Sequence, residues 1–504
     1  MAKFNTKTRG ASKTTNHEGA DAYKLDAKLE LYSAAVTTFL SNKFYETGGE
    51  TLERIKLLVA GIAKSDPAFV AKLAVYAREK MYLRSLPLVL TTELAKVHNG
   101  TDLVSRLVGR VVQRVDEITE LLSYYAQANG RTEVKKLGKL SKQIQKGLSY
   151  AFNKFDEYQF GKYNRDGAVK LKDALFVVHP KASSPEQQEL FDKIVAGSLA
   201  TPYTWEVELS KGNDKKETWE KLIESGKLGY MATLRNLRNI IEAGVSNKHL
   251  GSVATLLSDK EQVAKSKQFP FRFLSAYREI SEIASGKASM ILDALEEAMI
   301  ASAQNIRGFD YDQSIAISVD TSGSMSSKIS DKSSICNQDI GLVLAMLLHH
   351  RCKNVETSIF GDTQKHIQLP KNNILSNAET LDKYSDMVGS STNGYLVMQD
   401  LIKRKEVKDK VMIFTDMQLW DSEGSRWYGG GYQNFAPLWR EYRKDIAPNA
   451  KLYLFDLAGY GNTPVDVKEG GVYLIAGWSD KVFEMLDAYE KGSSAVAEIE
   501  KIVL

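Results

Sequence analysis

A carboxylate and two hydroxyl groups follow one apolar stretch of the chain. The apolar run 313–319 leads directly into Asp320, Ser322 and Ser324. A run of this kind, rich in β-branched residues, predicts a buried parallel strand that opens into a tight loop. Carboxylate and hydroxyl oxygens are the ligands that a hard divalent cation such as Mg²⁺ prefers. The stretch therefore indicates a cation site at the carboxyl edge of a sheet, where open α/β sheets bind their ligands.

Two further residues complete this candidate set. Asp416 ends a second apolar run, 410–416, and Thr392 lies in the loop 389–394 before an expected helix. For Ser322 alone, a helix-capping or turn role without metal is the better interpretation. All five residues, however, lie at strand ends or helix entries that can converge on one sheet edge, and this favours the metal. The predicted Mg²⁺ ligands are Asp320, Ser322, Ser324, Thr392 and Asp416.

Other chemistries fit these residues less well. Ser322 lacks the Gly-x-Ser-x-Gly setting of an acyl-transfer nucleophile, and no Gly-x-x-x-x-Gly-Lys-Ser/Thr phosphate loop occurs. Aspartyl-phosphate chemistry expects a second aspartate two residues after the first, where this chain has Ser322. The cluster His349-His350-x-Cys352 suggests zinc, but no second pair of ligands lies nearby. We therefore expect a protein without catalytic residues.

The elements expected around the candidate ligands alternate between strands and helices. Besides the two strands already described, we expect strands at 355–360, 451–457 and 471–475 and helices at 338–350, 394–403, 437–444 and 480–491. Such alternation predicts a doubly wound, mainly parallel α/β sheet with helices on both faces. This domain is expected to occupy residues 306–504.

The preceding part of the chain has a helical pattern almost throughout. Over residues 23–305, apolar residues recur three and four apart, and breaks fall at Ser65-Asp-Pro67, Pro87, Ser184-Pro185 and Pro270. Successive helices without strands predict stacked helix pairs, an all-α solenoid of the HEAT-like kind. Residues 1–22 form an expected N-terminal arm without its own core, which a later surface could still hold.

The composition is that of an ordinary globular protein of more than one domain. The chain has 504 residues, 43% apolar and 26% charged, and a net charge of +4 that does not by itself indicate a nucleic-acid binder. Two cysteines, Cys336 and Cys352, exclude a disulfide framework and fit a reducing compartment. Neither a signal peptide nor a membrane span is apparent. We expect a cytoplasmic protein.

Positive charge is concentrated in one part of the helical region. Residues 131–181 carry twelve basic and five acidic residues, a net charge of +7, so the rest of the chain carries −3. Lys135, Lys139, Lys142 and Lys146 have helical spacing that aligns them on one face. Such a row can bind a polyanion, which releases counterions on binding, or it can simply be a solvated lysine face. The row alone does not decide between these two interpretations. The nearby aromatic residues fit a core better than base-stacking platforms: Phe152, Phe155, Tyr158, Phe160 and Tyr163.

The five predicted ligands follow the pattern of a metal-ion-dependent adhesion site (MIDAS), and the domain that carries them resembles the von Willebrand factor A domain. By that resemblance, the hydroxyls of Ser322, Ser324 and Thr392 contact the ion, and Asp320 and Asp416 act directly or through water. Neutral ligands leave much of the charge of the ion unbalanced, so a carboxylate from a partner could complete its octahedron.

Short motifs in the helical region carry a second resemblance. In chain order they are Asn16-His-Glu-Gly19 with Ala22-Tyr-Lys-Leu25, Tyr76-Ala-Arg78, Leu83-Arg-Ser-Leu-Pro87, Lys170-Leu-Lys-Asp173 before His179-Pro-Lys181, and Leu234-Arg-Asn-Leu237 before Pro270-Phe271. Their order and spacing resemble the TROVE module of the Ro ribonucleoprotein family, and the bacterial Ro orthologues more than the animal protein. With the A-type domain that follows, the resemblance covers nearly the entire chain.

This resemblance implies a monomeric ring of HEAT-like helices closed by the A-type domain. It implies binding of small noncoding Y-type RNA on a basic outer surface, and of misfolded or single-stranded RNA 3′ ends in the central hole. It also implies RNA quality control together with a 3′ exoribonuclease such as polynucleotide phosphorylase. The residues expected to contact RNA are Lys135, Lys139, Lys142, Lys146, Lys162, Arg165, Lys170 and Lys172.

One position departs from the family pattern. Leu171 stands where the animal family has a histidine associated with RNA contact, so binding there would depend on Lys170 and Lys172. The competing hypothesis is a scaffold that binds proteins through the metal of the A-type domain, without RNA. A hydrolase is a weaker alternative because no nucleophile–base set is present.

Overall fold

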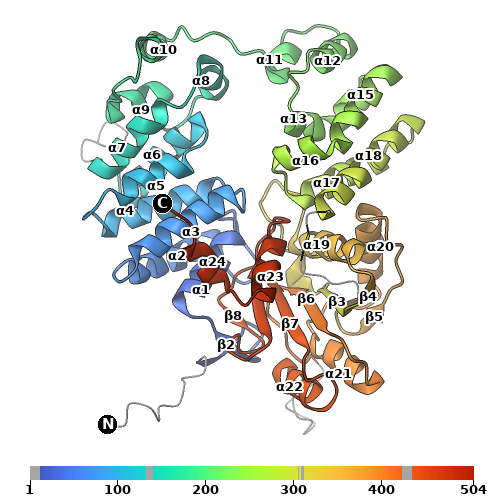
Figure 1. The fold of residues 1–504 in the computed structure, drawn as a ribbon. Helices are drawn as coiled ribbons and strands as arrows, with labels where there is room; N and C mark the ends of the chain where they lie inside the picture. The colour runs from blue at the N-terminus through green and yellow to red at the C-terminus, as the bar shows by residue number, and fades with distance from the viewer. Residues whose placement is uncertain (1–11, 132–139, 305, 308–311, 423–433) are drawn as a thin grey trace, which may run out of the picture. The chain divides into compact units, whose positions relative to one another are not determined.

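The fold is known from a computed structural model that describes residues 12–131, 140–304, 306–307, 312–422 and 434–504 (Figure 1). The chain forms two compact units. The first comprises residues 1–51, 233–241 and 250–496, and the second comprises 52–232, 242–249 and 497–504. A helix-rich region followed by a mainly parallel sheet confirms the predicted fold class. The predicted domain boundaries at residues 22 and 305 stay predictions, since the compact units interleave along the chain.

A mainly parallel sheet forms the centre of the first unit. In spatial order its strands are β5 (Gln364–His366), β4 (Asn354–Phe360), β3 (Ser314–Asp320), β6 (Lys410–Thr415), β7 (Lys451–Asp456) and β9 (Val472–Ala476). β5 runs antiparallel to β4, and the other neighbours pair in parallel. The chain leaves β3 toward β4 on one side and later returns to β6 on the other. The strand order therefore reverses between β3 and β6, which is where such sheets form a ligand crevice.

Helices cover both faces of this sheet. α19 (Asn337–Arg351) and α23 (Val482–Glu490) pack on one face, and α21 (Tyr395–Arg404) and α22 (Phe435–Asp445) on the other (Figure 1). The apolar core lies between these layers, where Trp439 of α22 is fully buried. The four helices occur close to where the sequence predicts them.

The N-terminal residues belong to the same compact unit as the sheet. β1 (Lys13–Thr15) and β2 (Asp21–Lys24) form an antiparallel hairpin, and β2 pairs with β8 (Asn462–Thr463). α1 (Ala27–Val36) follows and contacts β9. A later part of the chain thus holds the segment 12–24. The sequence had allowed for this packing of the N-terminal arm.

The second unit is helical, and two of its helices begin at the residue types expected from the sequence. Asp66 and Ser184 accept backbone N–H groups at the starts of α3 (Pro67–Glu79) and α10 (Pro185–Ala196), as expected for N-caps followed by proline. Pro87, expected at a helix boundary, instead lies in the first turn of α4 (Ser85–Val97). Proline is tolerated there because first-turn N–H groups have no intrahelical acceptor.

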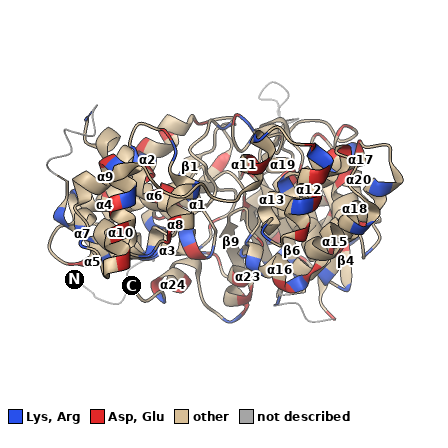
Figure 2. Ribbon diagram, turned by 90° about the horizontal axis from the view of Figure 1, so that it is seen from above, with Lys and Arg blue, Asp and Glu red and all other residues tan. Residues whose placement is uncertain are grey.

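The remaining described helices have six to eighteen residues. They are α2 (Gly48–Ile62), α5 (Leu103–Val111), α6 (Val115–Ala128), α7 (Lys142–Phe152), α8 (Glu157–Tyr163), α9 (Leu171–Val178), α11 (Trp205–Ser210), α12 (Lys215–Glu224), α13 (Tyr230–Arg235), α14 (Leu237–Glu242), α15 (Asn247–Ser258), α16 (Lys260–Ser266), α17 (Pro270–Ser281), α18 (Gly286–Ala303), α20 (Leu375–Ser385) and α24 (Ala495–Glu500). Among the described residues, none of the helices is long and apolar enough to cross a membrane. Basic and acidic residues are interspersed over the helices (Figure 2).

Candidate metal site and basic helical surface

The two aspartates predicted to bind metal lie at the ends of neighbouring strands. Asp320 is the last residue of β3, and Asp416 directly follows β6. β3 and β6 pair in parallel, so both residues lie at the same edge of the sheet, at the point where the strand order reverses. Both carboxylates are fully buried. The sequence pattern therefore placed these two residues together correctly.

The loop after β3 brings Ser322 and Ser324 to the same edge. The backbone N–H of Ser322 donates to Asp320 Oδ1 at 2.9 Å, and the hydroxyl oxygens of Ser322 and Ser324 lie 3.2 Å apart. Both side chains are buried. The N–H of Gly323 donates to the carbonyl of Ser390 at 2.9 Å, which ties this loop to the one that carries Thr392.

Thr392 is held against the loop that follows β6. Its hydroxyl donates to the carbonyl of Gln418 at 3.0 Å, and its own carbonyl accepts from the N–H of Trp420 at 3.1 Å. The N–H of Gln418 donates in turn to Asp416 Oδ1 at 3.1 Å. The structure thus brings all five predicted ligands together, buried, at one edge of the sheet.

The carboxylate of Asp416 is buried next to a second carboxylate, that of Asp320, and one of its oxygens has no hydrogen-bond partner among the described residues. Asp416 Oδ2 is buried and has no hydrogen-bond partner within the described residues, although the Ser324 hydroxyl lies close enough to favour the charged form of the carboxyl. Burial and the nearby charge of Asp320 raise the pKa of Asp416, and burial also raises the pKa of Asp320. Thr415 opposes that shift by donating to Asp320 Oδ2 at 2.6 Å.

A divalent cation fits this arrangement. Two buried carboxylates that repel each other can both stay charged when a cation balances them, and an orphaned carboxylate oxygen is costly unless something binds it. The donors are carboxylate and hydroxyl oxygens, which suit Mg²⁺ rather than a softer metal. In the part of the chain that the structure describes, no group of three or more His, Cys, Asp or Glu side chains is placed to hold a metal, and the candidate set itself contains two carboxylates with three hydroxyls.

The residues that had suggested zinc have other partners. The ring nitrogens of His349 lie 2.9 Å from Thr357 Oγ1 and 3.3 Å from the carbonyl of Leu369, and Nδ1 of His350 lies 2.7 Å from the carbonyl of Lys371. Cys352 is buried, and burial raises the pKa of its thiol to about 12. This cluster is structural: it ties the C-terminal end of α19 to the segments 354–360 and 369–371.

Three residues were not predicted near the metal edge, which is the edge of the sheet that carries Asp320 and Asp416. Asn16 Nδ2 donates to the carbonyl of Leu419 at 2.8 Å, and the N–H of His17 donates to Gln418 Oε1 at 2.9 Å. Tyr45 has its hydroxyl beside Ser324. The motif Asn16–Gly19 marked Asn16 and His17 only as part of a family resemblance, and Tyr45 was not singled out, because pairing between distant parts of the chain leaves no local pattern.

Part of the predicted basic row lies on the exposed face of α7. Lys142 and Lys146 are both exposed, and they share their helix face with Tyr150, which is 55% exposed. The spacing of four residues between each pair aligns the three side chains. Lys135 and Lys139, the other two members of the row, lie outside the described residues. Tyr150 was not predicted as a surface residue.

The aromatic residues of this region divide between core and surface. Phe152, Phe155 and Phe160 are buried, as the sequence predicts, but Tyr158 is 44% exposed and the core prediction for it is wrong. The Nζ atom of Lys162 lies 5.6 Å from the ring centroid of Tyr158 and 5.7 Å from that of Tyr163. These distances are in the range of cation–π attraction.

The residues around the start of α9 differ in exposure. Arg165, Lys170 and Lys172 are exposed; Lys170 pairs with Asp166 at 2.9 Å, and Lys172 Nζ donates to the carbonyl of Val195 at 2.7 Å. Leu171 between the two lysines is 1% exposed and belongs to the core. It therefore offers no surface for RNA. Phe176, four residues after Lys172, is 50% exposed.

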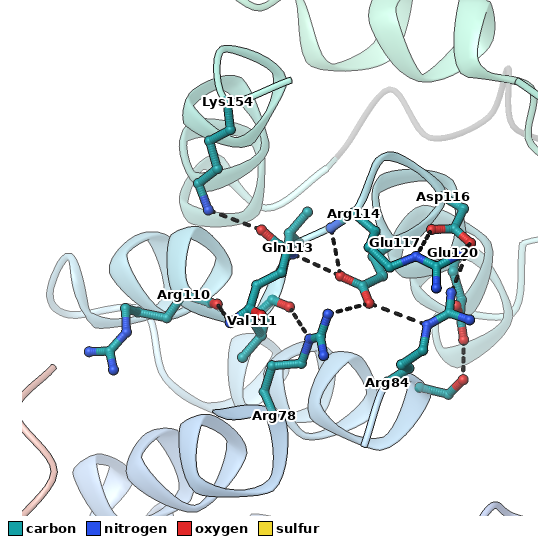
Figure 3. Close-up of polar contacts among 12 residues, drawn as sticks. Arg78, Arg84, Arg110, Val111, Gln113, Arg114, Asp116, Glu117, Glu120 and Lys154 are labelled. Atoms are coloured by element: carbon teal, nitrogen blue, oxygen red, sulfur yellow. Dashed lines mark hydrogen bonds and ion pairs between the residues drawn. The ribbon is translucent and has the colours of Figure 1, made fainter. Parts of the chain in front are cut away.

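The arginines of the two motifs near residue 80 are structural. Arg78 donates to Glu117 Oε1 at 2.8 Å and to the carbonyl of Val111 at 3.0 Å, and Arg84 donates to Asp116 Oδ2 at 2.8 Å (Figure 3). Lys154 from the basic stretch also turns inward, because its ammonium donates to backbone carbonyls after and within α5, at Val112 and Gly109. These cations are engaged by the protein itself.

Models of two known families match the chain. A model of the TROVE domain matches residues 25–198 and 185–307, and a model of the Ro60 vWA domain matches residues 314–490. The solved structures that resemble this one include the Deinococcus radiodurans RO (RSR) protein, with a TM-score of 0.60 and 15% identity, covering 93% of this chain and 100% of that one. At this identity the likeness concerns the fold.

Two curated relatives share part of the sequence. Telomerase protein component 1 of Mus musculus is 25% identical over 345 residues, which are 53% of this chain and 13% of that protein. The protein of the same name from Rattus norvegicus is 25% identical over 335 residues, 51% of this chain and 13% of its own length. This chain therefore spans a small part of the length of these relatives.

Proposed function

The chain belongs to the TROVE-domain family of Ro proteins, since the two family models match residues 25–307 and 314–490, and from this membership we propose that it binds RNA as a ribonucleoprotein component. The resemblance noted in the sequence is thereby confirmed. The family is one of RNA-binding ribonucleoproteins. We further propose that the protein has no catalytic activity of its own.

The observation that supports this proposal best is the exposed face of α7. Lys142 and Lys146 offer two ammonium groups to phosphates, and Tyr150 adds an exposed ring in the same row. Phosphate contacts supply affinity, while aromatic rings stack on unpaired bases with little sequence preference. On the adjacent α9, Lys172 and Phe176 repeat the combination of an exposed cation and an exposed ring four residues apart. A merely solvated lysine face would not require exposed aromatic residues.

In finer detail, we propose a Y-type small noncoding RNA on this basic surface and single-stranded 3′ ends as a second ligand. The protein would act as a cytoplasmic monomer in RNA quality control, beside a 3′ exoribonuclease. Lys162, Arg165, Lys170 and Lys172 would add contacts around the α7 face, together with Lys135 and Lys139. Mg²⁺ would occupy the site formed by Asp320, Ser322, Ser324, Thr392 and Asp416, where it would supply positive charge for an acidic group.

Salt dependence of RNA affinity tests the proposal. The probe is a fluorescent RNA hairpin with a single-stranded 3′ tail, titrated at several salt concentrations. The double variant Lys142→Gln/Lys146→Gln should flatten the slope of log K against log salt by about 1.4, since each lost contact to a single strand contributes about 0.7. The control is Lys215→Gln/Lys216→Gln, which removes the same charge from exposed positions of α12.

An unchanged slope in the α7 variant, or an equal change in the control, would refute the placement of RNA on this face. Tyr150→Ala tests stacking separately: it should weaken binding of the tailed RNA without altering the slope. An equal loss for a blunt hairpin would speak against stacking on unpaired bases.

A metal-dependent protein scaffold is the second candidate function. The orphaned Asp416 Oδ2 and the neutral hydroxyl donors favour it, because a cation held by few charges can bind a carboxylate of a partner. A protein that binds Mg²⁺ and an acidic peptide, but binds no RNA at any salt concentration, would favour this alternative.

A further inference from the structure

The N-terminal segment Asn16–Gly19 lies on the loop that follows β6. Asn16 is buried and bonds to the carbonyl of Leu419, while His17 bonds through its backbone to the side chain of Gln418. Gln418 Nε2 also donates to the carbonyl of Asp416 at 3.2 Å. One residue, Gln418, therefore contacts both the N-terminal segment and the backbone of a predicted metal ligand.

The side chain of Glu18 in this segment is oriented by Tyr45. The Tyr45 hydroxyl donates to Glu18 Oε1, and the same hydroxyl lies beside that of Ser324. Burial, the hydrogen bond to Glu18 and the charge of Asp416 raise the pKa of Tyr45, whereas the Ser324 hydroxyl lowers it. Tyr45 is thus within electrostatic reach of Asp416. A chain of polar groups runs from the metal edge through Ser324 and Tyr45 to Glu18.

Aromatic contacts fix this arrangement in place. The ring of His17 stacks on that of Tyr45 with centroids 4.9 Å apart, and Tyr460 packs edge-on against both rings. Lys43 holds the same corner by donating to the carbonyl of Ala458. The segment is also anchored by the hairpin that pairs with β8. Glu18 is consequently held in position near the metal edge.

We propose that Glu18 acts as an internal acidic group for the metal site, positioned by Tyr45, and that an external carboxylate must displace it to reach the cation. The inference rests on the proposed Mg²⁺ site. The charge balance there supports it, since Asp320 and Asp416 are the acidic members of the predicted ligand set and the remaining members are neutral hydroxyls. A third carboxylate nearby strengthens attraction for a divalent cation and competes with acidic partners for it.

The test measures Mg²⁺ binding to the full chain by titration calorimetry, with the metal alone as ligand. Glu18→Gln removes the charge but keeps the shape, and it should weaken Mg²⁺ binding on the order of tenfold, as expected for loss of one nearby charge. Tyr45→Phe removes the positioning hydroxyl and should weaken it in the same direction. Glu50→Gln, an equal charge change on an exposed residue of the same unit, is the control and should leave the affinity unchanged.

A second measurement uses acetate as the probe for an external carboxylate. In the presence of saturating Mg²⁺, Glu18→Gln should bind acetate more tightly than the unaltered protein, and without Mg²⁺ neither should bind it. Equal Mg²⁺ affinity in Glu18→Gln and the Glu50→Gln control, with unchanged acetate binding, overturns the inference about Glu18. Absence of Mg²⁺ binding by the unaltered protein overturns the metal site itself, so the two failures are distinct.

Discussion

Arg78 and Glu117 form a buried ion pair, with Arg78 Nη2 lying 2.8 Å from Glu117 Oε1. Both oxygens of this carboxylate accept hydrogen bonds, since Glu117 Oε2 accepts the backbone N–H groups of Gln113 and Arg114 at 2.7 and 3.0 Å. The pair therefore joins α3 to the start of α6 and caps that helix. Motif residues around position 80 thus have a structural role in this chain.

Glu117→Gln should destabilise the second unit strongly. The substitution leaves the guanidinium of Arg78 buried without its charge partner, and breaking such a pair costs about 3–5 kcal/mol. Urea unfolding followed by circular dichroism measures the loss. The control Glu53→Gln removes a carboxylate that is mostly exposed and pairs with Lys56, so it should cost less than about 1 kcal/mol. Similar midpoints for the two variants would contradict the buried role of Glu117.

Leu171→His should weaken the fold without strengthening RNA binding. Leu171 begins α9 and is 1% exposed, so the substitution would bury a polar imidazole at an apolar core position. We expect a loss of about 2–4 kcal/mol in the free energy of unfolding. The control Lys172→His places the same ring on the exposed neighbouring position. A variant that stays fully stable and binds RNA more tightly would show that position 171 can face the ligand.

The parts of the fold with a local signature were predictable. The strands that end in Asp320 and Asp416 are short apolar runs with a carboxylate at the end, and both lie where the pattern puts them. α20 (Leu375–Ser385) was missed: it begins after Ile374, which has no capping side chain, and its first N–H groups donate instead to the distant Glu296. The pairing of β2 with β8 was missed as well, because the sequence around residues 21–24 carries no local signal for a partner at Asn462 and Thr463.

The same limit applies to the candidate sites. Helical spacing correctly aligned Lys142 with Lys146, but it gave no measure of exposure, so Tyr158 was assigned to the core and Tyr150 was overlooked. Likewise, five candidate ligands could be matched to strand ends and helix entries, whereas Glu18 could not, because its hydrogen bond with Tyr45 has no local sequence signature. Burial and long-range contacts are properties of the packed chain, which a single sequence does not encode locally.

Mg²⁺ should protect the first unit against unfolding, and Thr392→Val should abolish that protection. A ligand that binds only the folded state stabilises it by RT ln(1 + [L]/Kd), about 2.7 kcal/mol at one hundred times Kd. Thermal unfolding with and without Mg²⁺ measures the shift. Thr321→Val is the matched control: its hydroxyl also donates to a carbonyl, that of Phe360 at 3.0 Å, but it is not a predicted ligand.

The two threonine variants separate metal binding from simple loss of a hydrogen bond. Both should lower stability in the absence of metal, since each loses one hydroxyl hydrogen bond to a carbonyl. The loss in Thr321→Val should be the smaller one, because the carbonyl of Phe360 still accepts the backbone N–H of Thr321 at 3.0 Å. Only the Thr321→Val protein should regain stability when Mg²⁺ is added. Equal Mg²⁺ shifts in both variants would remove Thr392 from the ligand set.

Stability should fall in mild acid because of His349. Its side chain is buried, and burial together with the charge of Lys371 lowers its pKa from 6.5 to about 4. Below pH 6.5 the imidazole of His349 therefore binds a proton in the unfolded chain but not in the folded protein. The free energy of unfolding should decrease as the pH falls from 6.5 to about 4, by about 3 kcal/mol at most.

The difference between His349→Gln and the unaltered protein isolates this effect from other titrating groups. Urea midpoints measured at pH 7 and at pH 5 should differ less in His349→Gln, because the substituted side chain takes up no proton in either state. His179→Asn, which removes an exposed imidazole, should keep the full dependence. A pH response that persists in His349→Gln would assign the acid sensitivity to other groups, since a neutral amide at position 349 has no linkage to proton concentration.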